Sequence, residues 1–144
     1  MAQNYRTAFA VLALGMALSV APAMAESMTF KASLTGKEEV PATTTKGAGT
    51  VDATYDGTSK KLAWKGTYTG LSGAVTAAHF HGPAEMGKNA GVVVPAPAMA
   101  SPFEGSAVLS DAQAADLIAG KIYFNVHTAA NPDGEIRGQL VKVK

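Results

Sequence analysis

The sequence predicts an all-β fold, an eight-stranded antiparallel Greek-key sandwich with one short helix before the seventh strand. Apolar residues recur mostly with a period of two, as on strands that bury one face. These runs are short, and glycine, proline and polar clusters separate them. Eight such runs in a chain of one-domain length are typical of a sandwich or a barrel.

The N-terminal segment predicts export. Arg6 precedes an apolar run from Ala8 to Val20, and the small-residue box Ala23-Met24-Ala25 follows. This is the pattern of a cleaved secretory signal peptide, residues 1–25, which leaves one domain at residues 26–144 in the periplasm or outside the cell. A short membrane anchor is the alternative, but the run falls short of the ~20 residues that a spanning helix needs. We therefore expect no membrane anchor in the mature form.

The expected strands follow one another with short connections. Asp56-Gly57-Thr58 predicts a turn between the second and third strands, and Asn131-Pro132-Asp133-Gly134 predicts a tight hairpin before the last. The expected strands are residues 28–35, 51–55, 62–68, 75–81, 92–94, 103–109, 121–127 and 135–143.

One helix interrupts the strands, and the sequence marks both of its ends. Ser110 and Gln113 have the spacing of a reciprocal N-terminal capping box. Gly120 suits the left-handed residue that follows the last turn. Between these signals a single apolar stripe is formed by Ala114, Leu117 and Ile118.

Composition excludes several function classes. The whole chain has 12 Lys plus Arg and 11 Asp plus Glu, and the signal segment holds one arginine and no acid, so the mature domain has no formal net charge. Nucleic-acid binding needs a clustered basic excess and is not expected. The absence of cysteine excludes thiolate catalysis and cysteine-based zinc sites. The chain has no Gly-x-Ser-x-Gly motif, phosphate loop or glycosidase-like acid pair, which argues against hydrolases.

The three histidines are the candidate metal ligands. His79 and His81 are two residues apart on an expected strand, so their rings lie on the same face. Burial of Phe80 turns both rings outward, and burial of Val126 turns His127 outward on another strand. If these strands are neighbours, three imidazoles can converge on one metal ion.

Other residues near these motifs are candidates for supporting roles. Asn125 and Glu135 could orient a ligating imidazole by a hydrogen bond, and Arg137 could attract an anionic substrate. An exposed Glu135–Arg137 ion pair is the simpler alternative. Met86, in the loop at residues 82–91, is a possible extra ligand or an incidental loop residue.

Three segments resemble the CHRD domain, the module first named from chordin. They are His79-Phe80-His81-Gly82-Pro83-Ala84, Gly91-Val92-Val93-Val94 and the block from Ala119 to Leu140, which ends in Gly138-Gln139-Leu140. The resemblance covers nearly all of the mature chain, from Phe30 to Val141. It implies a β-sandwich module of exported proteins, found in bacteria as a stand-alone domain whose biochemical role is poorly defined.

A weaker resemblance is to copper–zinc superoxide dismutase, and the expected sandwich is either of that type or immunoglobulin-like. The resemblance implies that His79, His81 and His127 are copper ligands and that Arg137 draws in the anion. The bridging histidine, the zinc loop and the disulfide of that family are missing. Any such enzyme would therefore be a copper-only oxidoreductase, and likeness of fold is weak support for activity.

These observations lead to two functional hypotheses. The first is an exported CHRD-domain protein that binds a single metal ion, copper before zinc, through three histidines, with superoxide-dismutase-like or copper-carrier activity. The alternative is a non-catalytic extracytoplasmic module that binds a protein partner or a matrix, with structural histidines. The sequence leaves the oligomeric state open, a homodimer included.

Overall fold

The structure is a computed structural model that describes residues 26–98 and 100–143. The expected signal peptide, residues 1–25, lies outside the described residues. In the described residues, nine antiparallel strands form a continuous sheet in the order β5-β4-β7-β8-β1-β2-β3-β6, and β9 also pairs with β1. The strands are β1 (Ser27–Thr35), β2 (Ala48–Asp56), β3 (Lys61–Thr69), β4 (Val75–His81), β5 (Val92–Pro95), β6 (Phe103–Val108), β7 (Tyr123–Thr128), β8 (Ile136–Gln139) and β9 (Val141–Lys142).

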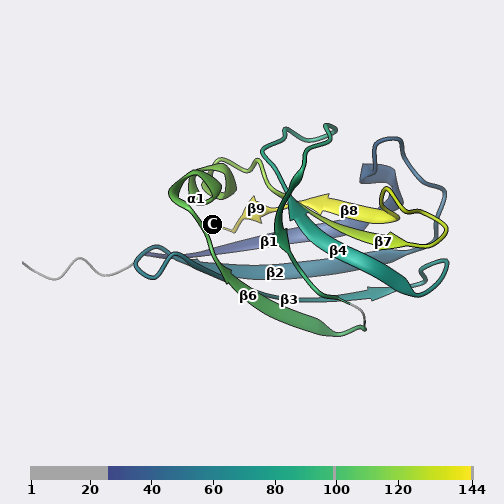
Figure 1. The fold of residues 1–144 in the computed structure, drawn as a ribbon, viewed down its shortest axis with the longest axis horizontal. Coiled ribbons are helices and arrows are strands. Elements are labelled where there is room, and N and C mark those ends of the chain that lie inside the picture. The colour runs from purple at the N-terminus through teal and green to yellow at the C-terminus, as the bar shows by residue number, and fades with distance from the viewer. Residues whose placement is uncertain (1–25, 99, 144) are drawn as a thin grey trace, which may run out of the picture.

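The sheet folds over, so that its two halves pack face to face (Figure 1). One half is β5-β4-β7-β8 and the other is β1-β2-β3-β6. Across the interior, the rings of Trp64 and Phe80 are 4.9 Å apart and those of Phe103 and Phe124 are 5.5 Å apart. The consecutive strands β1, β2 and β3 lie side by side, and β8 returns to pair with β1, which gives the Greek-key order β8-β1-β2-β3. The predicted all-β antiparallel fold is confirmed.

The alternation of apolar residues that predicted the strands also determines which side chains lie in the core. Along β1, Phe30, Ala32 and Leu34 are buried and the residues between them face outward. In the opposite half, Phe80 of β4 and Phe124 of β7 are fully buried. Each fully buried Phe or Leu side chain stabilises the fold by about 1.5–3 kcal/mol through removal of apolar surface from water. Burial of Phe80 and Phe124 fixes which residues of β4 and β7 face outward.

The last expected strand, residues 135–143, is two strands instead of one. Leu140 separates β8 from β9 and is fully buried, and its N–H donates to the carbonyl of Ile122. Immediately after it, Val141 pairs with Lys31 of β1. β8 pairs with both β7 and β1, whereas β9 pairs with β1, a change of partner that alternation along the sequence does not reveal.

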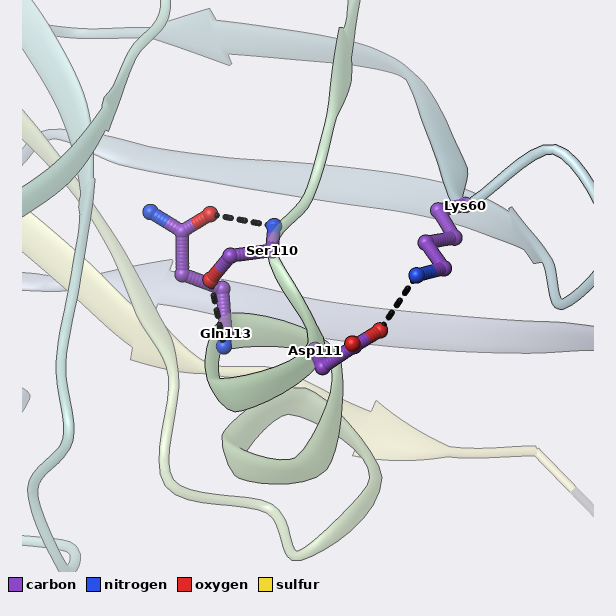
Figure 2. A network of polar contacts seen from close by, with 4 residues as sticks. All are labelled: Lys60, Ser110, Asp111 and Gln113. Carbon is purple, nitrogen blue, oxygen red and sulfur yellow. Dashed lines mark hydrogen bonds and ion pairs between the residues drawn. The ribbon is translucent and has the colours of Figure 1, made fainter.

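The expected helix is α1 (Asp111–Ile118), and both of its end signals are confirmed. Figure 2 shows the capping box, in which Ser110 Oγ accepts from Gln113 N at 3.2 Å and Gln113 Oε1 accepts from Ser110 N at 2.9 Å. Gly120 has φ 73°. Ala114 and Leu117 are buried, but Ile118 at the end of the helix is exposed and lies at the edge of the apolar stripe. Among the described residues, no helix is long and apolar enough to cross a membrane.

Candidate metal centre

The three histidines meet on the outer face of the β4–β7 pair. These strands are antiparallel neighbours, with Ala77 opposite His127 and His79 opposite Asn125. One potential ligand atom from each histidine lies within 4.8 Å of those of the other two. His79 Nδ1 and His127 Nε2 are only 3.2 Å apart. The structure therefore brings together the three residues that strand alternation placed on one face.

Backbone carbonyls fix the orientation of two of the rings. His81 Nδ1 lies 3.0 Å from the carbonyl oxygen of Ala90, and His127 Nδ1 lies 2.9 Å from that of Pro132. A carbonyl only accepts, so in both rings Nδ1 carries the proton and Nε2 keeps its lone pair, and the lone pair of His127 Nε2 can accept from Nδ1–H of His79. His81 Nε2 is buried without a hydrogen-bond partner in the part of the chain that the structure describes. Histidine ligands of metals are commonly held in this way.

The environment also favours the neutral form that can bind a metal. Burial lowers the pKa of His79, and the neighbouring His127 lowers it further. Burial also lowers the pKa of His81 and outweighs the opposing hydrogen bond to Ala90. Neutral imidazole is the ligating species, so little free energy is needed to remove protons at neutral pH.

The spacing of the nitrogens suits one metal ion. Two nitrogens bound tetrahedrally at about 2.0–2.1 Å from zinc lie roughly 3.3 Å apart, close to the 3.2 Å between His79 Nδ1 and His127 Nε2. The largest separation in the cluster is within 4.8 Å, so the third nitrogen has to approach by roughly 1–2 Å. Rotation of a side chain can supply such a movement. The three-histidine group can therefore hold a metal ion.

Tyr123 and Arg137 support the site from the β8 side. The ring of Tyr123 stacks on His81 with centroids 5.0 Å apart and planes at 4°. The guanidinium carbon of Arg137 lies 4.4 Å from the centroid of the same tyrosine ring. The tyrosine hydroxyl accepts from the N–H of Ala90, the residue whose carbonyl holds His81. Tyr123 thus connects the ring of His81 to both the loop and Arg137.

Arg137 joins two chain segments that cover this face. Its Nε donates to the Glu38 carbonyl in η1 (Gly36–Glu38) at 2.5 Å. Nη1 donates to Asn89 Oδ1 at 2.8 Å, and Nη2 donates to the Lys88 carbonyl at 3.2 Å. The side chain is buried, and these are the contacts of a positioning residue. Attraction of an anion by Arg137 stays a prediction.

Glu135 belongs to a separate polar cluster. Its carboxylate accepts hydrogen bonds from Thr45 Oγ1, Ser72 N, Ser72 Oγ and Thr128 Oγ1, at 2.5–2.7 Å. Burial tends to raise the pKa of Glu135, but these hydrogen bonds lower it to about 2. Its hydrogen bonds in the described residues go to this set and not to a histidine. Here the carboxylate joins β7 to the segments around Thr45 and Ser72.

The two remaining candidates from the sequence are Asn125 and Met86. Asn125 is buried directly across from His79, and its Nδ2 donates to Glu39 Oε2 at 3.5 Å. Met86 is 64% exposed and lines a surface groove with Ser33 and Val141. That groove lies over β1 and β9, so Met86 as an additional ligand stays a prediction.

Sequence reasoning missed Glu39, the two carbonyl acceptors and the contact between Tyr123 and His81. Strand alternation puts Tyr123 on the same face as Asn125 and His127, but it does not show which ring Tyr123 stacks on. The carbonyls of Ala90 and Pro132 carry no sequence signal, because every residue has one. Glu39 follows η1, a short element that the sequence analysis did not predict.

The comparisons with known proteins agree with the motifs. The family model of the CHRD domain matches residues 30–140, well over half of the chain, and this range includes all three histidines. Searches of curated proteins and of solved structures found no match. The chain therefore belongs to the CHRD domain family.

Proposed function

We propose that this protein is an exported metal-binding domain that holds one copper ion through His79 Nδ1, His81 Nε2 and His127 Nε2. The observation that carries the proposal is the convergence of three imidazoles, two of which have Nδ1 engaged by a backbone carbonyl. Nε2 of His81 is buried and lacks a hydrogen-bond partner among the described residues, a costly arrangement that a metal ion would relieve.

Copper is the preferred metal because of the donor set. Imidazole nitrogens bind copper and zinc well, whereas calcium and magnesium prefer oxygen ligands. For a given nitrogen site, Cu²⁺ binds most tightly among the divalent first-row metals. The chain has no cysteine, so no thiolate contributes to the choice.

The activity depends on access to the metal. His79 is only partly buried, whereas His81 and His127 are 8% exposed, so the ion would be reached from the side of His79. Three protein ligands leave a coordination position for water or a small substrate. This arrangement supports either superoxide-dismutase-like chemistry or reversible copper transfer.

Copper titration of the purified, metal-free protein tests the proposal. We expect one Cu²⁺ per chain, and His81→Ala or His127→Ala should weaken binding by at least about 100-fold, because even partners of ligands contribute 10–100-fold. Thr76→Ala, at an exposed position of β4, is the matched control and should bind like the wild type. Circular dichroism establishes that each variant is folded. Failure of the folded wild type to bind micromolar copper at neutral pH would exclude the proposal.

A superoxide consumption assay on the copper-loaded protein separates the two activities. Catalysis that is lost in His127→Ala indicates the oxidoreductase, whereas stoichiometric binding without turnover indicates a carrier. Competition between copper and zinc in the same preparation identifies the preferred metal.

Export is tested by the mass of the protein recovered from its native compartment. We expect a chain that begins at Glu26, after the box Ala23-Met24-Ala25, in the periplasmic or secreted fraction. A cytoplasmic protein that retains residues 1–25 would contradict this part of the proposal.

A further inference from the structure

Two buried oxygen atoms beside the histidine cluster have no hydrogen-bond partner within residues 26–98 and 100–143. They are Glu39 Oε1 and Asn125 Oδ1, in side chains that are 6% and 3% exposed. Both atoms accept hydrogen bonds, and neither can donate one while Glu39 is ionised. A buried acceptor without a partner loses its hydrogen bonds to water and gains none in return, so two together call for an explanation.

The two residues already contact each other through their other polar atoms. Asn125 Nδ2 donates to Glu39 Oε2 at 3.5 Å. At Gly134, an added Cβ would lie 2.5 Å from Asn125 Oδ1 and 2.7 Å from Glu39 Oε1, so the two unpartnered oxygens face the same point. Gly134 has φ 132° and no side chain, which allows the backbone to approach this pair.

We propose that Glu39 and Asn125 form a buried proton-binding site, in which the neutral carboxyl of Glu39 donates a hydrogen bond to Asn125 Oδ1. The amide then donates to one carboxyl oxygen and accepts from the other, so the acid and the amide close a ring of two hydrogen bonds. A single proton satisfies both orphaned acceptors. It also removes a buried negative charge that would otherwise have to be solvated.

The charged groups around Glu39 do not offset the effect of burial on the pKa of its carboxyl. Burial raises the pKa of Glu39 to about 7, although Arg137 of β8 and the hydrogen bond from Asn125 of β7 both act to lower it. Asp133, in the turn after β7, lines the same 220 Å³ surface hollow as Glu39 and is exposed. In the loop after β4, Lys88 is exposed and contacts Arg137 through its carbonyl. Arg137 has three hydrogen-bond partners elsewhere, so its charge is shared.

The proton-binding site connects the segment around η1 to β7, the strand that carries His127. Glu39 directly follows η1, and the carbonyl of the preceding Glu38 accepts from Arg137. Asn125 lies on β7, two residues before His127 and opposite His79. Proton loss replaces a mutual hydrogen-bond pair by a buried charge, so the segment around η1 is held less firmly above neutral pH.

The sign of the pH effect follows from the direction of the shift. The pKa of Glu39 is about 7 in the folded protein against an ordinary value of 4.5, so the folded state binds the proton more tightly. This contribution to stability is fully present below pH 4.5 and is lost as the pH rises through 7. Between pH 6 and pH 8 the folding equilibrium constant should fall about tenfold.

Carboxyl NMR of ¹³C-glutamate-labelled, metal-free protein tests the site directly. We expect one glutamate carboxyl to titrate near pH 7, and that resonance should be absent in Glu39→Gln. Glutamine can make the same pair with Asn125 without a proton, so this variant should fold. Glu38→Gln, at the adjacent exposed glutamate, is the control and should retain the titration.

Urea unfolding at pH 6 and pH 8 provides the second measurement. The folding equilibrium constant of the wild type and of Glu38→Gln should fall about tenfold from pH 6 to pH 8. That of Glu39→Gln should not show this fall. A Glu39 carboxyl that titrates near its ordinary value, or an equal pH dependence in Glu39→Gln, would overturn the proposal. Since no metal is present, a failure of copper binding leaves this test unaffected.

Discussion

The cluster around Glu135 and the cluster of histidines are both buried polar groups on the same half of the sandwich, yet they are satisfied to different degrees. Glu135 accepts four hydrogen bonds, and the pKa of its carboxyl is lowered to about 2. Next to the histidines, the pKa of Glu39 is raised to about 7, and His81 Nε2 lacks a partner among the described residues.

This difference distinguishes a structural network from a candidate binding site. The hydroxyl and amide donors around Glu135 already donate to its carboxylate, so few of these groups are free to bind a ligand. Around the histidines, lone pairs converge without enough donors, so a metal ion or a proton improves the arrangement. An unsatisfied buried cluster is therefore the better indication of function in this domain.

The largest effect should come from breaking the satisfied cluster. Glu135→Ala removes the acceptor of the buried Thr128 hydroxyl and of the two Ser72 donors, and should destabilise the fold by about 3 kcal/mol in urea unfolding. Copper affinity, measured under conditions where the variant is folded, should change far less than in His127→Ala. An equal loss of copper affinity in the two variants would show that the clusters are not separate.

Acid unfolding sharpens the same comparison. The pKa of Glu135 in the folded protein is about 2, below its ordinary value of 4.5, so its contribution to stability is present above pH 4.5 and is lost as the pH falls toward 2. The wild type should therefore lose more stability than Glu135→Gln between pH 5 and pH 2.5. A similar loss in both proteins would show that Glu135 is not the group responsible.

A smaller effect is expected at the connection between the histidine face and its covering segments. Arg137→Lys keeps the charge but cannot donate to Glu38, Asn89 and Lys88 in the same fork. We expect a loss of about 1–2 kcal/mol in urea unfolding, with a modest loss of copper affinity. If the protein has superoxide-dismutase-like activity, a fall in turnover with unchanged stability would instead support anion attraction by Arg137.

The smallest effect should come from Met86. This side chain is 64% exposed over the β1 and β9 side, so Met86→Leu should leave copper affinity within about twofold of the wild type. A loss greater than tenfold would show that the loop brings the thioether to the metal.

The fold and the convergence of the three histidines could be predicted because both depend on strand alternation. Burial of Phe80 and Val126 decides the direction of His79, His81 and His127, and side chains on a strand follow a period of two. The contacts of Glu39, Arg137 and Glu135 could not be predicted in this way. They depend on which loops cover the face, such as η1 and the segment at Lys88 and Asn89, and loop paths have no such period.

The hydrogen bond from His127 to Pro132 makes the orientation of the His127 ring depend on the length of the turn after β7. Surface turns between strands usually tolerate an inserted residue, because their ends remain close. Here the carbonyl that selects the tautomer of the His127 ring lies five residues after that ring, inside the turn itself. One added residue would leave the sandwich intact but would move the Pro132 carbonyl oxygen that accepts from His127. Among relatives, a change in the length of this turn should therefore coincide with loss of the histidine.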